Sequence, residues 1–556
     1  MVSPLNGNKI AYFSMEIGVR NDIHTYSGGL GVLAGDVIRS SADLSLPMVA
    51  VTLVSRKGYL RQKLTASGEQ QELSDGWDPS KIMDLAPKTV EVNLDSRIVK
   101  VQAWIYEHKS AIGGIVPILF LDTDVEGNDP ADRTITDTLY GGDGKYRIKQ
   151  EAILGVAGTR MLEALGYKIS KYHMNEGHAA FLALELLQKF EYDIEKVRKH
   201  CVFTTHTPIE AAFDKWPYDL IVPILGREFP VQVIKELGGD DKLNMTLLAF
   251  NLSGFQNGVT KAHTKYSMKL FPHYSIHAIT NGVHSNTWTS QSFHEVLDEY
   301  IPGWASEPEL LVRIDKVPSC KILAAHNANK QNLAALLKEK TGAEFDPERL
   351  TFGFARRATG YKRATLVFSD VNRLREINKK YPLQFVFAGK AHPNDTSGKD
   401  AIKEIFWHKE ELKDEIKIVY VENYDMNIAA KLTSGVDVWL NTPFPPMEAS
   451  GTSGMKAAHN GVVNFSVLDG WWIEGCIEGV TGWSIGPSPD EAVSEDERRK
   501  RELEDLFNKM KYVIAPKFYD DRDGWIETMK NSIGKVAYYF NTDRMMRRYI
   551  TDAYLG

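Results

Sequence analysis

The sequence predicts an α/β protein with two doubly wound, Rossmann-like domains, and two stretches of alternating elements carry that prediction. In the N-terminal half, a strand-like run at Lys9–Ser14 is followed by a glycine-rich turn, a helical pattern over residues 32–44 and an apolar run at 48–54. This order is typical of parallel strands joined by a helix. A similar alternation begins near residue 350 and continues to residue 467. A chain of 556 residues is long enough for two large domains.

We place the domain boundary near residue 285 and predict an N-terminal α/β domain at 1–285 with a β-rich elaboration, a C-terminal α/β domain at 286–510 and terminal helices at 511–556. Hydrophobic periodicity predicts the elements within them. Further strands are expected at 90–92, 98–106, 115–121, 201–205, 276–280, 350–354, 383–388, 416–421, 436–440 and 462–467. Further helices are expected at 145–165, 179–190, 247–269, 365–380, 399–413 and 427–432, and the charged stretch 491–505 fits a solvated helix face.

Composition and charge exclude several classes of protein. The net charge of −7 gives no overall basic field for nucleic acid. Cys201, Cys320 and Cys476 lie far apart and match no metal or redox spacing, which fits a reducing compartment. The sequence has no apolar run of about 18 residues that would span a membrane, and its N-terminus lacks the pattern of a signal peptide. The expected location is therefore cytoplasmic, with no nucleic acid or membrane as partner.

Three segments of the N-terminal half are candidates for ligand contact. The turn at 28–31 (GGLG) precedes a predicted helix and has the character of an anion site, whereas it matches the dinucleotide fingerprint only loosely. His173, Glu176 and His178 lack the spacing of a zinc protease, so we expect a polar network and no metal. His206 follows a predicted strand, where α/β sheets bind ligands, although inert turns also use histidine at such positions.

Two segments of the C-terminal half together predict a phosphate site. A basic turn at 356–363 (RRATGYKR) follows a predicted strand, and arginine and lysine are the side chains that pair with phosphate. The loop at 441–461 places small and hydroxyl residues before Lys456 and a helix start. Glycines let the backbone approach a ligand, and an amine beside an anion site serves as a cation or as a nucleophile. The loop is not a P-loop, since Met455 separates the last glycine from the lysine.

Together these segments resemble the α-glucan phosphorylases of glycogen, starch and maltodextrin, in their compact bacterial and archaeal form. The stretch 448–456 (EASGTSGMK) is similar to the cofactor-lysine motif of that family, and the basic turn is similar to its phosphate segment, with Arg356 in place of a lysine. Residues 12–16 (YFSME), the GGLG turn and residues 204–217 (TTHTPIEAAFDKWP) also match, so the likeness spans nearly the whole chain.

The resemblance implies the GT-B glycosyltransferase architecture, in which two Rossmann-like domains face a cleft and the last helices cross back to the N-terminal domain. It implies pyridoxal 5′-phosphate as cofactor and no metal. The implied catalytic residues are Lys456, Arg357, Lys362 and His206. The implied cofactor contacts are Lys456, Thr452, Gly29, Arg356, Tyr424 and Trp288. The implied substrate contacts are Glu448, Ser450, Gly451, Tyr361, Glu176, Asn175, Glu16 and Gly28, with Glu176 in place of an aspartate.

The implied activity is reversible phosphorolysis. Orthophosphate and an α-1,4-glucan give α-glucose 1-phosphate and a chain one unit shorter, with retention, and the phosphate group of the cofactor acts as acid and base. A homodimer is the implied assembly. One alternative is a nucleotide-sugar-dependent glucan synthase of the same architecture, which would lack the lysine-bound cofactor. The others are a pyridoxal enzyme acting on amino acids and an inactive glucan-binding protein.

Overall fold

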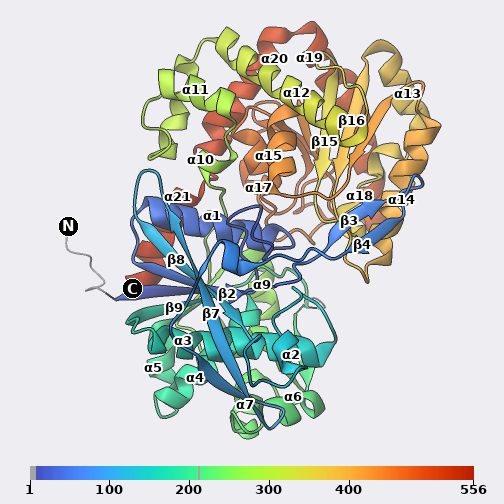
Figure 1. Ribbon diagram of the computed structural model, residues 1–556. Coiled ribbons are helices and arrows are strands. Elements are labelled where there is room, and N and C mark those ends of the chain that lie inside the picture. The colour runs from blue at the N-terminus through green and yellow to red at the C-terminus, as the bar shows by residue number, and fades with distance from the viewer. Residues whose placement is uncertain (1–7, 211–212, 556) are drawn as a thin grey trace. The chain divides into compact units, whose positions relative to one another are not determined.

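The computed structural model of the protein describes residues 8–210 and 213–555 (Figure 1). The contacts between residues divide the chain into two compact units. Unit 1 comprises Met1–Leu60, Ser74–Thr280 and Met545–Gly556, and unit 2 comprises Arg61–Leu73 and Asn281–Arg544. These units differ from the predicted domains, because residues 61–73 group with unit 2 and most of the terminal helical segment does so too.

Unit 1 is built on a mixed sheet to which the described residues contribute ten strands, in the order β14-β13-β10-β9-β1-β2-β8-β7-β5, with β6 paired to β7. The strands from β14 to β8 are parallel, whereas β7 is antiparallel to β8. The strands are β1 (Lys9–Ser14), β2 (Met48–Leu53), β5 (Asp84–Leu85), β6 (Val90–Leu94), β7 (Arg97–Lys109), β8 (Ile115–Asp122), β9 (Ile169–Asn175), β10 (Cys201–Thr204), β13 (Phe255–Gly258) and β14 (Ile276–Ala278).

Helices cover both faces of this sheet, so its parallel strands are buried on two sides and consist of nearly continuous apolar runs. On one face, Tyr12 and Phe120 cluster with apolar residues of α1 (Gly29–Asp43) and of the C-terminal helix α21 (Thr542–Tyr549). On the other face, Phe13 clusters with residues of the helices that follow β8 and β9. The unit also contains η1 (Pro79–Lys81), η2 (Asp132–Thr134), α2 (Gly144–Ala152), η3 (Ile153–Ala157), α3 (Gly158–Ala164), η4 (Gly177–Ala179), α4 (Phe181–Lys189), α5 (Ile194–His200), β11 (Lys215–Pro217), α6 (Tyr218–Leu225), α7 (Val231–Gly238), β12 (Lys242–Asn244), α8 (Met245–Asn251), α9 (Lys261–Leu270) and η11 (Ile550–Tyr554).

The single helix predicted over residues 247–269 is wrong, because the structure has α8, the strand β13 and α9 in that stretch. β13 has the sequence FQNG and lies buried between β10 and β14. Its polar side chains are satisfied inside the protein, since Gln256 donates to the carbonyl oxygen of Phe250 and Asn257 accepts from the hydroxyl of Thr204. Buried amides of this kind remove the apolar pattern by which a central strand is predicted.

Unit 2 is built on a parallel sheet with the order β17-β16-β15-β18-β19-β20. Its strands β15 and β16 are labelled in Figure 1. Val386 and Ala388 cluster with α12 (Ser319–Thr341) and α15 (Met426–Gly435) on one face. On the other face, Phe385 and Phe387 pack against Phe368 at ring-centroid distances of 6.1 and 5.7 Å. The strands are β15 (Leu350–Ala355), β16 (Leu383–Ala388), β17 (Lys417–Val421), β18 (Val438–Asn441), β19 (Val463–Val467) and β20 (Gly482–Ile485).

Unit 2 also contains a separate antiparallel hairpin of β3 (Arg61–Leu64) and β4 (Gln70–Leu73). Among the helices that the structure describes, none is long and apolar enough to cross a membrane. The unit also contains α10 (Ser285–Trp288), α11 (Gln291–Tyr300), η6 (Pro308–Lys316), η7 (Gly360–Lys362), η8 (Leu366–Phe368), α13 (Val371–Lys380), α14 (Thr396–Glu411), α16 (Ser453–Ala458), α17 (Trp472–Gly475), α18 (Glu495–Lys509), η9 (Met510–Ile514), α19 (Ala515–Asp520), α20 (Arg522–Asn531) and η10 (Ser532–Ala537).

Candidate functional site

The candidate residues of unit 1 follow strands β1, β9 and β10, which are neighbours in the sheet. The order of the strands reverses at β1, because the chain continues from β1 to β2 on one side and later returns to β9 on the other. Open parallel sheets bind ligands outside the carboxyl ends of their strands at such a reversal. Glu16, Glu176 and His206 follow β1, β9 and β10 respectively, so all three lie at this edge of the sheet.

Glu16 holds the glycine turn in place. Its Oε2 accepts hydrogen bonds from the backbone N–H groups of Ser27 (2.6 Å) and Gly28 (3.1 Å), and its Oε1 accepts from the hydroxyl of Tyr140 (3.0 Å). The N–H of Gly28 is therefore used within the protein. Helix α1 begins at Gly29 without a side-chain cap, and the first amide groups of a helix have no partner inside it. The amide of Gly29 is thus the better-placed anion donor of the two glycines.

His206 is a neutral imidazole with a defined tautomer. Its Nε2 donates to the amide oxygen of Asn175 at 2.7 Å, and the amide nitrogen of Asn175 donates to the hydroxyl of Ser14 at 3.1 Å. This pair of bonds assigns the proton to Nε2 and leaves Nδ1 as an acceptor. Burial, followed by the nearby His263, lowers the pKa of His206 to about 3. His206 and Asn175, which the sequence analysis selected separately, are therefore in direct contact.

Glu176 supports the backbone around His206. The residue has a positive φ of 74°, and its Oε2 accepts from the N–H of His206 (2.7 Å) and from the hydroxyl of Thr207 (3.0 Å). Burial raises the pKa of its carboxyl group. Oε2 of Glu176 thus accepts its hydrogen bonds from the turn that carries His206. The substrate contact implied for Glu176 stays a prediction.

The other histidines of this region belong to polar networks, as expected. His173 is buried between the hydroxyls of Tyr554 (2.7 Å) and Thr204 (2.8 Å). His178 lies 3.3 Å from a carboxylate oxygen of Asp214. Within residues 8–210 and 213–555, no group of three or more His, Cys, Asp or Glu side chains is arranged to hold a metal ion.

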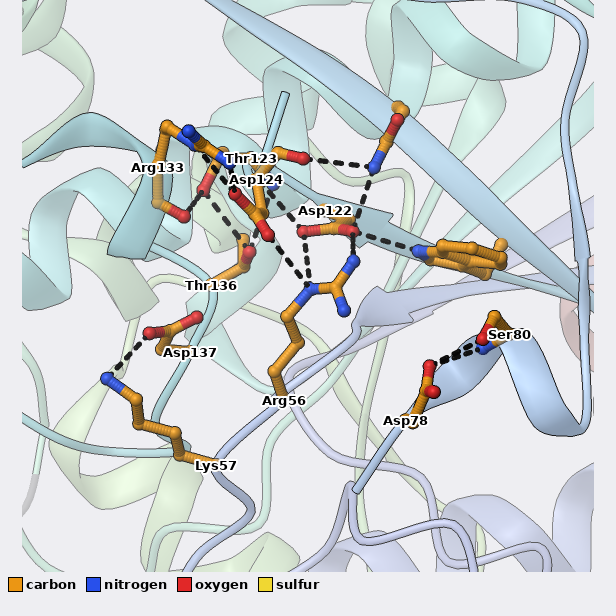
Figure 2. Close-up of polar contacts among 12 residues, drawn as sticks. Arg56, Lys57, Asp78, Ser80, Asp122, Thr123, Asp124, Arg133, Thr136 and Asp137 are labelled. Carbon is orange, nitrogen blue, oxygen red and sulfur yellow. Dashed lines mark hydrogen bonds and ion pairs between the residues drawn. The ribbon is translucent and has the colours of Figure 1, made fainter. Parts of the chain in front are cut away.

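A second network, which the sequence analysis did not identify, joins the carboxyl ends of β2 and β8. Figure 2 shows Arg56 paired with Asp122, whose Oδ2 lies 2.5 Å from Nη2 and also accepts from the indole of Trp104 at 2.8 Å. Burial opposes the ionisation of Asp122, but Arg56 outweighs it and holds the pKa below its ordinary value. Arg133 pairs with Asp124 in the same network. These satisfied ion pairs fix the loops of unit 1 at this edge.

In unit 2, the order of the strands reverses at β15, with β16 on one side and β18 on the other. The basic turn follows β15 and the small-residue loop follows β18, so both predicted phosphate segments lie at this reversal. They meet at Glu448, whose Oε2 lies 3.0 Å from Nη1 of Arg356 and also contacts Nζ of Lys362. All three side chains are nearly buried.

The charges of this cluster shift one another's titration. Burial and the neighbouring Arg356 lower the pKa of Lys362 to about 7, against the opposing effect of Glu448. Burial opposes the ionisation of Glu448, but Lys362 and Arg356 outweigh it and hold its pKa below the ordinary value. Lys362 therefore exchanges its proton near neutral pH, and an additional anion would favour its charged form.

The remaining residues of the basic turn differ in role. Arg357 is exposed and makes no hydrogen bond or ion pair with any residue that the structure describes. Nζ of Lys362 lies 4.5 Å from the ring centroid of Tyr361, and burial raises the pKa of that tyrosine. Arg363 is structural, because it pairs with Glu502 at 2.6 Å and donates to the carbonyl oxygen of Pro443.

Lys456 lies on the short helix α16 and is 6% exposed. Its Nζ is 3.7 Å from the ring centroid of Trp288. The amide of Asn460 donates to the carbonyl oxygens of both Lys456 (3.1 Å) and Trp288 (2.8 Å). This shared amide holds the backbone of the lysine and of the tryptophan at one place, so the amine and the indole ring are kept together.

The loop before α16 is held by a residue that the sequence analysis missed. Asp469 accepts from the N–H of Glu448 at 2.9 Å, and the carbonyl oxygen of Ser450 accepts from the N–H of Trp471 at 3.0 Å. Burial and the charge of Glu448 raise the pKa of Asp469 to about 7. Gly451 has a positive φ of 71°, which favours glycine there. An aspartate after an apolar strand is common, so no signal in the sequence singles it out.

Thr452 and Tyr424 complete the candidates of unit 2. Thr452 precedes α16, and its carbonyl oxygen accepts from the N–H of Lys456 at 3.2 Å. Tyr424 follows β17 and packs against the apolar cluster that contains Ala355 and Ala388, and burial raises its pKa. Apart from Trp288, which lies on α10, the predicted residues of unit 2 follow β15, β17 and β18 and so lie toward the carboxyl edge of one sheet.

Comparison with known proteins identifies similar chains. A model of a family described as carbohydrate phosphorylase matches residues 230–481. A maltodextrin phosphorylase of Thermococcus litoralis is 36% identical over 98% of this chain and 70% of its own length. A glycogen phosphorylase of Mycobacterium tuberculosis has the same identity and coverage. A glycogen phosphorylase of Aquifex aeolicus is 34% identical over 98% of this chain and 86% of its own length.

Proposed function

This chain belongs to the carbohydrate phosphorylase family, and from that premise we propose that it is an α-1,4-glucan phosphorylase. It would release the terminal glucose of a maltodextrin, glycogen or starch chain as α-glucose 1-phosphate, with retention and in a reversible reaction. The observation that carries the proposal is the meeting of Arg356 and Lys362 at Glu448, beside the loop that leads to Lys456. We further propose the GT-B architecture for the two sheets and a cytoplasmic location; the homodimer stays a prediction.

The residues of unit 2 fit pyridoxal phosphate. Lys456 supplies a nearly buried amine, and Trp288 presents an aromatic face to it. Arg356 supplies a guanidinium group, and Thr452 and Tyr424 lie on the neighbouring turns. When bound, the cofactor would supply a phosphate group able to exchange a proton with the substrate phosphate. Because the amine of Lys456 is held in a defined place, we assign it the anchoring of the cofactor.

The positive charges of the basic turn would offset the repulsion between the cofactor phosphate and the substrate phosphate, which is strong where little water is present. We assign the substrate phosphate to Arg357, Tyr361 and Lys362. Arg357 is exposed and without an ion pair among the described residues, so it is available to a ligand. Lys362 has a pKa of about 7, and the arrival of an anion would hold its proton in place.

The glucosyl unit requires acceptors and donors for its hydroxyls. Arg356 and Lys362 both contact Oε2 of Glu448, and no described residue donates a hydrogen bond to its Oε1. We therefore assign it a sugar hydroxyl, together with Ser450 and Gly451. In unit 1 we assign glucan contacts to His206 through its acceptor Nδ1, and to Asn175, Glu176 and Glu16. We assign phosphate contact to the turn of Gly28 and Gly29, through the amide of Gly29, because the N–H of Gly28 already donates to Glu16.

Borohydride treatment followed by peptide mapping tests the cofactor assignment. We expect a pyridoxyl phosphate label on Lys456 and on no other lysine, and an unlabelled Lys456 would refute the assignment. Glucose 1-phosphate should still form from maltodextrin and orthophosphate after the treatment, since the proposed chemistry uses the phosphate of the cofactor. Glucan extension from a nucleotide sugar, without a labelled lysine, would favour the synthase instead.

A further inference from the structure

The hairpin of β3 and β4 is an unusual part of unit 2, because the chain on both sides of it belongs to unit 1. Figure 1 shows it beside α14, and Glu72 of the hairpin pairs with Lys399 of that helix at 2.8 Å. A side chain at Gly68, in the turn of the hairpin, would lie 2.7 Å from the ring of Phe406. The hairpin is therefore seated closely on unit 2, although its strands are mainly polar and exposed.

Gln62 is the buried exception on β3, with 2% exposure. Its backbone N–H donates to the side-chain oxygen of Asn423 (3.1 Å), and its own side-chain oxygen accepts from the N–H of Asn423 (2.9 Å). Its Nε2 donates to the carbonyl oxygen of Gly389 at 2.8 Å. Asn423 has a positive φ of 56° and directly precedes Tyr424. The two reciprocal bonds thus hold the turn that places Tyr424.

Gln70 makes a similar contact from β4. Its Oε1 accepts from the N–H of Ala391 and its Nε2 donates to the carbonyl oxygen of the same residue, both at 2.9 Å. The amides of the two glutamines are also joined, since Nε2 of Gln62 donates to Oε1 of Gln70 at 2.9 Å. Ala391 is fully buried, so an unpaired N–H or carbonyl there would be costly.

The segment at 389–391 lies directly behind the basic turn. Ala391 forms a parallel bridge with Ala358, whose N–H donates to the carbonyl oxygen of Lys390 at 2.9 Å. The N–H of Arg356 donates to the carbonyl oxygen of Ala388 at 3.2 Å. A side chain at Gly389 would lie 2.0 Å from the carbonyl oxygen of Arg356, so the two segments touch without a gap. Any displacement of this segment therefore displaces the turn that carries the cations.

We propose that Gln62 and Gln70 are positioning residues that hold the basic turn at 356–358 in its anion-binding geometry, acting through the segment at 389–391. The inference rests on the proposed function for the identity of the anion as orthophosphate. A side-chain amide is suited to holding a turn, because it can donate and accept a hydrogen bond at the same time. It thereby takes the place of a neighbouring strand as partner for the N–H and carbonyl groups of the turn. The expected consequence is specific: orthophosphate binding weakens, whereas the affinity for glucan does not change.

The test compares Gln70→Ala and Gln62→Ala with Gln71→Ala, an exposed glutamine beside Gln70 on the same strand whose side chain leaves the opposite face. Three quantities are measured on the cofactor-loaded protein: the KM for orthophosphate, the KM for maltodextrin, and the Kd of orthophosphate by calorimetry without glucan. We expect the KM and Kd for orthophosphate to rise about tenfold in the two variants, as expected for the loss of well-placed hydrogen bonds. The KM for maltodextrin should stay within about twofold, as should every value of Gln71→Ala.

Equal orthophosphate Kd values in Gln70→Ala, Gln62→Ala and Gln71→Ala would overturn the proposal. So would a lower melting temperature with an unchanged orthophosphate Kd, since that result describes a merely structural hairpin. If Gln70→Ala does not fold, Gln70→Glu gives the same comparison, because it keeps the acceptor for Ala391 and removes the donor. Failure of wild-type protein to form glucose 1-phosphate would refute the proposed function alone, since the orthophosphate Kd still tests the two glutamines.

Discussion

Replacing Glu448 by glutamine is expected to destabilise the ligand-free protein and to strengthen its binding of orthophosphate. The wild-type carboxylate is buried and contacts Arg356 at 3.0 Å as well as Lys362. Removing one partner of a buried pair costs about 3–5 kcal/mol, because the remaining charge is left without compensation. Here the cost should be smaller, because Lys362, with a pKa of about 7, can release its proton.

The magnitude follows from what remains in Glu448→Gln. The amide oxygen still accepts from Arg356, while the loss of the negative charge lowers the pKa of Lys362 below about 7. At neutral pH the lysine is then mostly uncharged, and the loss reduces to that of charge-assisted hydrogen bonds, about 1.5–3 kcal/mol. We therefore expect the free energy of unfolding to fall by about 2 kcal/mol at pH 7.

Urea unfolding with and without orthophosphate measures both effects. Orthophosphate replaces the missing negative charge, so it should stabilise Glu448→Gln more than it stabilises the wild type. In a separate activity assay, the rate of glucose 1-phosphate formation should fall by at least about tenfold. Glu404→Gln, at an exposed position of α14, is the matched control and should change neither quantity. Unfolding at the same urea concentration as the wild type, or equal stabilisation by orthophosphate, would refute the account of the cluster.

Three further predictions concern unit 1. Burial and the charge of Asp214 raise the pKa of Glu151 from 4.5 to about 8. The folded protein therefore binds more protons at this residue than the unfolded chain does, so the free energy of unfolding should fall as pH rises from about 4.5 to about 8. Glu151→Gln should flatten that fall in urea titrations at several pH values, and an unchanged slope would contradict it. Asn175→Asp places a carboxylate against Nε2 of His206 and should raise its pKa from about 3, which moves the acidic limb of the activity profile to higher pH; an unmoved limb would count against it. Gly31→Ala brings a Cβ to 2.7 Å from Oε2 of Glu16 and should lower stability by about 1–3 kcal/mol in urea unfolding, whereas wild-type stability would show that the turn yields.

The parallel strands were the part of the fold that the sequence predicted best. The strand predicted at Lys9–Ser14 is β1 with the same bounds, and that predicted at 383–388 is β16. Both are buried on two faces, so their apolar residues form unbroken runs. β13 and the β3–β4 hairpin were missed for the opposite reason, since amides fill buried positions in both. Asn257 of β13 accepts from Thr204, and Gln62 of β3 donates to Gly389, so both partners are distant in the sequence.

The sequence placed the charges of the site but not their partners. The basic turn and the lysine loop were found because the motifs have unusual composition, and both lie at the strand reversal of unit 2. The spacing of the cations does not predict which of them forms an ion pair within the protein. Arg363 is paired with Glu502, whereas Arg357 in the same turn is exposed. Asp469 was missed because a single hydrogen bond to the N–H of Glu448 defines its role, and no periodicity reports that bond.

The internal pairing of Glu448 also bears on how tightly orthophosphate would bind. Arg356 and Lys362 are not free cations in the protein alone, because the carboxylate already satisfies them. An incoming phosphate must share or replace this carboxylate, so part of its electrostatic gain is offset by the interaction that it weakens. Without Glu448 the buried charges of Arg356 and Lys362 would lack a negative partner. Without those two residues the buried carboxylate of Glu448 would lack a positive one. A reversible enzyme benefits from this arrangement, since an anion site of moderate affinity allows the phosphate to leave in either direction of the reaction.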